Sequence, residues 1–295
     1  MISLEGRVAI ITGAGRGLGR EHALLFARLG AAVVVNDRGA ANDGTGSDQT
    51  PAEAVVEEIR ALGGEAIANA DDVSDWSGAE QLVRSTVETF GDLDILVNNA
   101  GILRDRLIVN MSEAEWDSVV AVHLKGHFAP TRWAAAYWRE QHKAGHARRR
   151  NLVHTSSTSG LFANPGQANY GAAKSGIATL SQIAAKELQR YGVVSNCVAP
   201  AARTRLTLAT PGLEGLMAPP DDGEAFDQWD PANVSPLVAY LASAQCRFNG
   251  ETFYVQGGTV TRFQSWAFGD RVERAGRWDV TELADALGRL DLGDR

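Results

Sequence analysis

Short runs of β-branched and aliphatic residues alternate along the chain with longer stretches whose apolar residues recur at helical spacing. The short runs are residues 7–12, 32–36, 65–69, 95–98, 151–155, 193–199 and 252–255. The cores of the first two, residues 8–11 and 32–35, are apolar at every position, which is typical of strands buried on both faces. The pattern therefore predicts an α/β fold, a Rossmann-type, doubly wound parallel sheet of seven strands with helices on both faces.

Helix boundaries can be placed at two points. Residues 17–29 carry leucines at helical spacing, and Gly30 stands where a helix would end. Together with the strands on either side, this segment forms one βαβ unit. Farther along, Ser112 and Glu115 match a capping box, which predicts a helix that begins at this serine.

Three segments depart from the regular alternation. Residues 39–50 form a loop rich in glycine, asparagine and aspartate, and residues 203–230 contain three prolines. Loops as long as the second are usually lids or binding loops. We expect one dinucleotide-binding domain over residues 1–261, with the 203–230 loop as its substrate loop, and a C-terminal extension over residues 262–295. The extension can cover either the site or an oligomer interface, and the sequence favours neither.

The charge balance excludes wide nucleic-acid binding. The chain has 28 Lys and Arg against 36 Asp and Glu, a net charge of −8, which is the wrong sign for neutralising a phosphate backbone. Its one basic cluster, residues 148–150, leads into a strand. Two cysteines are too few for a disulfide framework, and no apolar run is long enough to span a bilayer. With no leader at the start and no Ser-Lys-Leu address at the end, we expect a cytoplasmic protein.

A glycine-rich loop follows the first strand. Its residues are Gly13, Ala14, Gly15, Arg16, Gly17, Leu18 and Gly19. Such glycines let the backbone turn sharply and approach a pyrophosphate at the N-terminus of the next helix. Asp37 ends the second strand about twenty residues on, where a carboxylate would bind the adenosine ribose. The combination predicts a dinucleotide site, and because a carboxylate repels a 2′-phosphate we expect NAD as the cofactor rather than NADP. Arg38 is the one neighbour able to pair a phosphate.

A second group of residues suggests acid–base chemistry. Tyr170 and Lys174 are four residues apart, so on a helix they share one face, and the ammonium should lower the pKa of the phenol. A tyrosine with a lowered pKa can exchange a proton with an alcohol or a carbonyl. Ser157 lies thirteen residues earlier and can hold the oxygen of the substrate. No metal is expected in this site.

These motifs, in this order, resemble those of the short-chain dehydrogenases/reductases. The resemblance rests on residues 12–19, on the Asn-Asn-Ala-Gly run 98–101, on Ser157, on residues 170–174 and on the Ala-Pro pair 199–200. It implies hydride transfer with Ser157, Tyr170 and Lys174 as the catalytic centre. It also implies that Asp72 and Val73 flank the adenine, that Asn99, Ala100 and Gly101 support the cofactor, and that Pro200 lies near the nicotinamide.

One position differs from the family pattern. Many members carry an asparagine in the helix after residues 98–101, where it holds a water in a proton relay with the lysine, and this chain has His123 instead. A neutral imidazole both donates and accepts, so a relay role and a structural role both stay open. His127 and His154 are interpreted as structural.

Several segments resemble a particular branch of the family. Residues 35–37, 101–105, 122–126 and 166–170, with the 39–50 insertion, are similar to the (3R)-hydroxyacyl-CoA dehydrogenase unit of peroxisomal multifunctional enzymes type 2. Those enzymes continue into hydratase and sterol-carrier regions, so we expect a stand-alone bacterial relative in fatty acid metabolism. The resemblance implies a (3R)-3-hydroxyacyl-CoA as the substrate.

Other functions remain open at this stage. The same fold and residues serve hydroxysteroid and other alcohol or ketone dehydrogenases. A dinucleotide-binding regulator without turnover is a possibility of another class, and so is a structural oligomer subunit, although neither has any need for Ser157 or Tyr170. We further expect a homodimer with two-fold symmetry, whose interface involves the helices over residues 112–141 and 169–189.

Overall fold

The computed structural model describes residues 2–208, 215, 217–220 and 225–290. It divides the chain into two compact units, Met1–Arg262 and Phe263–Arg295, which are described separately here. Part of the proposed substrate loop, residues 203–230, therefore lies outside the described residues.

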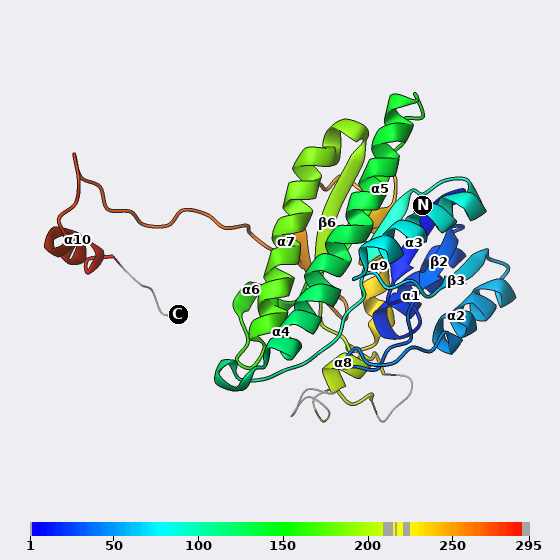
Figure 1. Cartoon of the computed structure of the whole chain (residues 1–295), viewed down its shortest axis with the longest axis horizontal. Helices are drawn as coiled ribbons and strands as arrows, with labels where there is room; N and C mark the ends of the chain where they lie inside the picture. The colour runs from blue at the N-terminus through cyan, green and yellow to red at the C-terminus, as the bar shows by residue number, and fades with distance from the viewer. Residues whose placement is uncertain (1, 209–214, 216, 221–224, 291–295) are drawn as a thin grey trace. The chain divides into compact units, whose positions relative to one another are not determined.

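The first unit is built on one eight-stranded sheet, shown in Figure 1, with the order β3-β2-β1-β4-β5-β6-β7-β8. The strands are β1 (Val8–Thr12), β2 (Ala32–Asn36), β3 (Ala66–Asn69), β4 (Ile95–Asn98), β5 (Arg150–Thr155), β6 (Val193–Pro200), β7 (Thr252–Gln256) and β8 (Thr259–Arg262). Neighbours from β3 to β7 pair in parallel, and β8 pairs antiparallel with β7. The predicted doubly wound parallel sheet is confirmed, and β8 adds a strand to it.

Strand β8 escaped the sequence analysis for a physical reason. All four of its residues are exposed, so nothing selects the apolar run that marks the other strands. It follows β7 through Gly257 and Gly258, and Gly257 has a φ of 51°. This two-residue glycine loop is typical of a hairpin, and together with the β-branched residues Thr259, Val260 and Thr261 it is the sequence signal for the strand.

Helices cover both faces of the sheet (Figure 1). In chain order the helices of this unit are α1 (Gly17–Arg28), α2 (Thr50–Ala61), α3 (Trp76–Phe90), α4 (Glu113–Val120), the π-helix η2 (Ala121–Lys125), α5 (Gly126–Lys143), α6 (Thr158–Phe162), α7 (Ala168–Leu188), α8 (Arg205–Leu208) and α9 (Ser235–Ala242), with short 3₁₀ turns at Ile108–Asn110, Gln189–Tyr191 and Pro231–Val234. The predicted capping box is present, since Ser112 and Glu115 bond reciprocally at the start of α4.

The two faces of the sheet bury separate cores because successive strand residues point to opposite sides. Ile11 and Val33 pack with α1, α2 and α9, whereas Ile10 and Val34 pack with α3, α5 and α7. Because helices cover both faces, polar chemistry is left to the two borders of the sheet at which the strands begin and end. These borders, and not the outer strands, are called the edges of the sheet here. The carboxyl ends of the parallel strands meet at one of them, which is where α/β sheets bind ligands.

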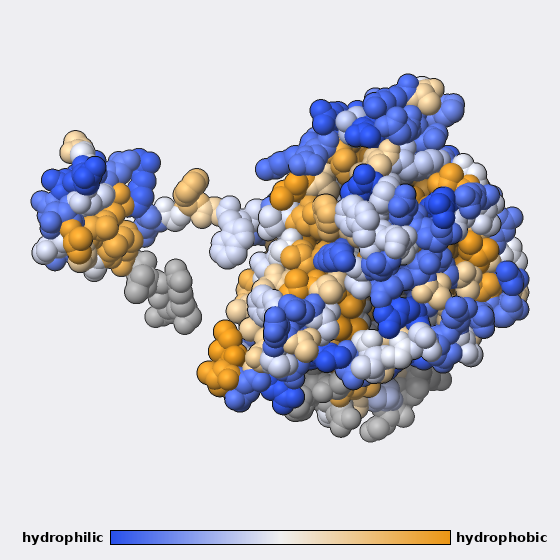
Figure 2. Space-filling view, in the orientation of Figure 1, coloured by the Kyte–Doolittle hydropathy of each residue, from blue (hydrophilic) through white to orange (hydrophobic). Residues whose placement is uncertain are grey.

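An exposed apolar segment precedes α4. Leu107, Ile108 and Val109 are each more than half exposed, and Figure 2 shows apolar groups at the border of the first unit.

The second unit contains α10 (Val280–Leu287), which Asp279 caps by accepting a 2.8 Å hydrogen bond from the N–H of Thr281. Among the described helices, none combines the length and the apolar character that crossing a membrane requires.

Candidate active site

The glycine-rich loop lies at the carboxyl end of β1 and packs tightly against the end of β4. Gly13 has a φ of 63°, and a Cβ on it would lie 2.8 Å from the Cα of Ala100. A Cβ on Gly19 would lie 2.2 Å from the carbonyl oxygen of Gly13. Any larger residue at either position would push the loop out of place, so the glycines are needed for its shape.

Thr12 and Asn99 connect this loop to β4. The Thr12 hydroxyl oxygen accepts hydrogen bonds from the N–H groups of Asn99, at 2.9 Å, and Ala100, at 3.1 Å. The Asn99 amide donates in return to the carbonyl oxygen of Thr12, at 3.0 Å. Asn99 thus supports the loop with its side chain.

The start of α1 fits a pyrophosphate. Arg16 precedes the helix in an extended conformation and provides no side-chain cap, and no acidic residue lies in the first turn. The N–H groups of this turn, together with the helix dipole, therefore remain suited to an anion. Gly17 begins the helix with a φ of 53°, and Leu18 packs against the core.

The acidic residues at the ends of β2 and β3 differ in their surroundings. Asp37 accepts a 2.8 Å hydrogen bond from the N–H of Gly15 and a 2.7 Å bond from the N–H of Gly39. Asp72 instead accepts from Ser74, at 2.9 Å, and forms an ion pair with Arg38. Arg38 is therefore already paired, and Asp37 is the carboxylate placed beside the glycine loop.

The remaining predicted cofactor residues lie around the same edge of the sheet. Val73 is buried, and Pro200 is the last residue of β6. A Cβ on Gly101 would lie 2.5 Å from Cε1 of His123, so this glycine allows the imidazole to approach. The donors and the close backbone approach of this edge fit a dinucleotide.

The three predicted catalytic residues come together next to this cradle. Ser157 follows β5 and caps α6, its hydroxyl oxygen accepting from the N–H of Ser159 at 3.2 Å. Tyr170 lies in the first turn of α7, and Lys174 is one turn later with its Nζ 5.5 Å from the centre of the phenol ring. The ammonium donates a 2.6 Å hydrogen bond to the carbonyl oxygen of Thr155.

The pKa values of this centre differ from the sequence expectation. Burial raises the pKa of Tyr170 to about 12; a hydrogen bond with Ser157 opposes the rise, and the nearby Asp105 carboxylate adds to it. Burial also lowers the pKa of Lys174 to about 7. The expectation that the pKa of the phenol is lowered is therefore wrong for the chain without ligands, because burial of Tyr170 raises its pKa more than the hydrogen bond with Ser157 lowers it.

His123 lies inside the site. It belongs to η2, and its Nε2 is 2.8 Å from the carbonyl oxygen and 3.1 Å from the amide nitrogen of Ile102. Its ring meets the Tyr170 ring edge to face, with centroids 5.0 Å apart. Burial, followed by the charge of Lys174, lowers the pKa of His123 well below 6.5. The ring is therefore neutral at physiological pH. A loss of activity at mildly acidic pH would not be explained by protonation of His123.

Sequence reasoning interpreted His127 and His154 as structural and did not place them beside His123 and Lys174. His127 and His154 are fully buried, and their rings stack with centroids 5.8 Å apart. The Asn98 amide approaches Nδ1 of His154 at 3.3 Å. A helical spacing of four between His123 and His127 predicts a shared face, but no sequence pattern brings His154 to it.

This buried group contains six side-chain polar atoms with no hydrogen-bond partner among the described residues. They are Asn98 Oδ1, His123 Nδ1, both ring nitrogens of His127, His154 Nε2 and Thr155 Oγ1. Buried polar side chains therefore gather next to Lys174 at this end of the sheet.

Asp105 is the other residue that the sequence analysis did not place in the site. Its Oδ2 accepts a 2.7 Å hydrogen bond from the Gln167 amide, while its Oδ1 is buried with no partner among the described residues. Burial raises the pKa of this carboxyl. Asp105 belongs to the site because the fold places its carboxylate near Tyr170.

The fold and this arrangement define a class of protein. Residues 7–209 match the family description "short chain dehydrogenase", which covers more than half of the chain. The chain therefore belongs to the short-chain dehydrogenase family and is an oxidoreductase that uses a nicotinamide dinucleotide.

Two curated relatives and one solved structure show which members of the family this chain resembles. The chain is 47% identical over 292 residues to the hydroxyacyl-CoA dehydrogenase ChsB1 of Mycobacterium tuberculosis, covering 96% of this chain and 88% of the relative. It is 44% identical to the peroxisomal multifunctional enzyme type 2 of Drosophila melanogaster, over 88% of this chain but 40% of that enzyme. A crystal structure of a short chain dehydrogenase from Mycobacterium avium superposes with a TM-score of 0.85 at 48% identity, covering 98% of this chain and 96% of the other. The resemblance drawn from the sequence is confirmed.

Proposed function

We propose that the protein oxidises a (3R)-3-hydroxyacyl-CoA to the 3-oxoacyl-CoA with NAD. The observation that carries the proposal is the meeting of Ser157, Tyr170 and Lys174 beside a loop suited to a dinucleotide. The substrate class is supported by the relatives, whose names include a hydroxyacyl-CoA dehydrogenase. A role in fatty acid metabolism follows from this substrate.

The proposed mechanism assigns each catalytic residue one task. Tyr170, as the phenolate, accepts the proton of the substrate hydroxyl at its oxygen and becomes the neutral phenol, and Ser157 holds the same substrate oxygen with a hydrogen bond. Lys174 stabilises the phenolate by charge and binds the ribose of the cofactor. When bound, the nicotinamide provides the hydride acceptor. Because the pKa of Tyr170 is high in the ligand-free chain, the ammonium of Lys174 has to remain charged for the phenol to act as a base.

The preference for NAD rests on Asp37 and Arg38. The Asp37 carboxylate lies beside the glycine loop, where it would repel a 2′-phosphate, and Arg38 is held by Asp72. The proposed cofactor-binding residues are Gly13, Gly15, Arg16, Gly17, Leu18, Gly19, Asp37, Asp72, Val73, Asn99, Ala100, Gly101, Tyr170, Lys174 and Pro200.

The experiment that tests this function follows NADH formation with a panel of alcohols. We expect turnover with (3R)-3-hydroxyacyl-CoA thioesters and little with the (3S) isomers, sterols or simple alcohols. Turnover of hydroxysteroids alone would replace the substrate and keep the chemistry. NADH binding without any turnover would favour a dinucleotide-binding regulator.

A symmetric homodimer and a cytoplasmic location complete the proposal, with residues 1–261 as the catalytic domain and 262–295 as an extension. Exposed apolar residues on the candidate interface helices, Phe128 on α5 and Ile183 on α7, support the dimer. Light scattering checks it, since a monomer at working concentration would contradict this part.

A further inference from the structure

Two loops beside the candidate active site carry exposed apolar side chains. Leu107, Ile108 and Val109, in the turn before α4, are 58%, 75% and 84% exposed, and Phe162, the last residue of α6, is 73% exposed. These four residues are called the apolar rim. Single exposed apolar residues are common on protein surfaces, but a group of them usually marks a binding surface.

Hydrogen bonds fasten the two loops of the apolar rim to each other. The N–H of Arg106 donates to the carbonyl oxygen of Gly166 at 2.7 Å, and Arg106 pairs with Gln167 in a parallel β-bridge. The side-chain amide of Gln167 donates to Asp105 at 2.7 Å. The exposed turn and the loop after α6 therefore form one continuous border.

This border begins next to the catalytic residues. Asp105 is close enough to Tyr170 for its charge to act on the phenol, and Leu107 comes two residues later. Two residues of chain span at most about 7 Å. Phe162 lies five residues after Ser157 on α6, which corresponds to a rise of about 7.5 Å along the helix. Both halves of the apolar rim are thus a short distance from the catalytic centre.

The backbone next to Phe162 is strained. Ala163 has a φ of 62° and a ψ of 149°, and it is the one non-glycine residue with a positive φ in the part of the chain that the structure describes. Residues with a Cβ rarely adopt this conformation, and where they do, the site often binds a ligand. The strained residue fixes where the chain turns away from the exposed phenyl ring.

The proposed substrate has an arm that suits such a surface. Its reacting carbon has to lie at Tyr170 and Ser157, so the acyl chain and the CoA thioester leave this point in different directions. The acyl chain is apolar and gains free energy when an apolar surface removes it from water, whereas CoA carries phosphates. A second copy of the protein fits less well, because a stable interface needs about 800 Å² from each partner and four such side chains offer roughly half of that.

We propose that the apolar rim binds the acyl chain of the substrate, beyond the carbon atoms that lie at the catalytic centre. Its residues determine chain-length specificity and favour long acyl chains, because a short chain ends before it reaches them. The inference rests on the hydroxyacyl-CoA substrate proposed above.

The test compares steady-state rates with (3R)-3-hydroxybutanoyl-CoA and (3R)-3-hydroxydodecanoyl-CoA. The wild type should have the lower KM for the dodecanoyl substrate. In the double variant Leu107→Ser/Phe162→Ser this KM should rise by about tenfold with little change in kcat, because the lost contacts are the same in the ground state and the transition state. The KM for the butanoyl substrate should change by less than about twofold.

A matched control separates the apolar rim from the loss of any exposed apolar residue. Leu62, between α2 and β3, is 55% exposed, close to the 58% of Leu107, and it lies at the edge where the strands begin. Leu62→Ser should leave both KM values unchanged. The conservative double variant Leu107→Met/Phe162→Leu keeps the apolar surface and should keep most of the preference for the long chain.

The outcomes distinguish this inference from the proposed function. Turnover of both substrates with equal KM values in the wild type, or an unchanged KM ratio in the serine double variant, would overturn the inference and leave the function intact. Absence of turnover with either substrate would remove the function and the inference with it. A wild-type dimer that becomes a monomer in the serine double variant by light scattering would assign the apolar rim to a subunit interface instead.

Discussion

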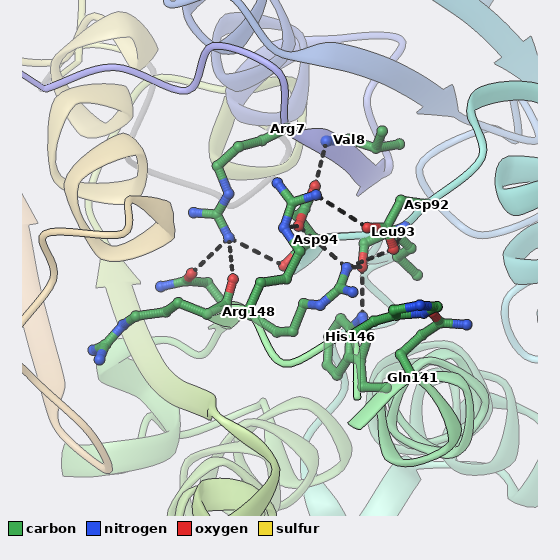
Figure 3. Close-up of polar contacts among 12 residues, drawn as sticks. Arg7, Val8, Asp92, Leu93, Asp94, Gln141, His146 and Arg148 are labelled. Atoms are coloured by element: carbon green, nitrogen blue, oxygen red, sulfur yellow. Dashed lines mark hydrogen bonds and ion pairs between the residues drawn. The ribbon is translucent and has the colours of Figure 1, made fainter. Parts of the chain in front are cut away.

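The two edges of the sheet both bury polar and charged side chains, but they differ in how many of the buried polar atoms have hydrogen-bond partners in the protein. Where the strands begin, at what we call the closed edge, Arg7, Asp94 and Arg150 take part in hydrogen bonds and ion pairs. Figure 3 shows Arg7, Asp92, Asp94 and Arg148 in this network. Where the strands end, buried atoms of Asn98, His127 and other residues have no partner among the described residues. The closed edge joins distant segments of the chain, and the other edge holds the candidate catalytic residues.

The closed edge joins segments that are distant in the sequence. Arg7 donates to the carbonyl oxygen of Ala242 at 2.6 Å and to the side chain of Asn151 at 3.0 Å. Asp94 accepts from the N–H of Val8 at 3.0 Å and from Arg150 at 3.1 Å. The basic cluster 148–150 thus leads into β5, as predicted, with a buried ion pair at its end.

Replacing the phenol at the catalytic edge should have the largest effect on function. Tyr170→Phe removes the proton acceptor, and turnover should fall by about 10²–10⁴-fold while NADH still binds. Steady-state rates and fluorescence titration measure the two properties. Lys174→Ala should reduce both. A Tyr170→Phe variant with near wild-type turnover would contradict the mechanism.

At the closed edge we expect a substitution to lower the stability of the protein and to leave its turnover nearly unchanged. Asp94→Asn removes the buried carboxylate that pairs with Arg148 and Arg150 and should lower the free energy of unfolding by about 3–5 kcal/mol. Urea denaturation measures the loss, and kcat of the folded variant should change little. Glu57→Gln, at an exposed ion pair with Arg60 on α2, is the matched control and should cost less than about 1 kcal/mol.

His123 allows a finer test of the catalytic edge. His123→Leu removes both ring nitrogens and should slow the chemical step by about ten- to a thousandfold, whereas His123→Asn should keep substantial activity. Since the pKa of His123 lies well below 6.5, its protonation should not shape the rate profile around neutral pH. Wild-type rates in His123→Leu would make the residue structural.

The smallest effect concerns the choice of cofactor. Asp37→Ser removes the carboxylate expected to repel a 2′-phosphate, so the ratio of kcat/KM for NAD over NADP should fall by about tenfold or more. Rates with the two cofactors measure it. A wild type that prefers NADP would reverse the proposed assignment of NAD.

The comparison also explains what the sequence could predict. Strands β1 to β7 and the glycine loop follow from local patterns of apolar residues and glycines, and the structure agrees within one residue at nearly every end. The group of buried histidines and the place of Asp105 beside Tyr170 depend on side chains brought together from separate elements, which no local pattern encodes. The direction of the pKa shift of Tyr170 was wrongly predicted. The four-residue spacing shows that the charge of Lys174 lies nearby, but it does not show how deeply the phenol is buried.

The most direct test of the account is NADH formation from a (3R)-3-hydroxyacyl-CoA by the wild type and by Tyr170→Phe, with the (3S) isomer as the control substrate. We predict rapid NADH formation from the (3R) isomer, little from the (3S) isomer, and almost none with the variant. No NADH from the (3R) isomer with the wild type, or equal rates for wild type and variant, would contradict it.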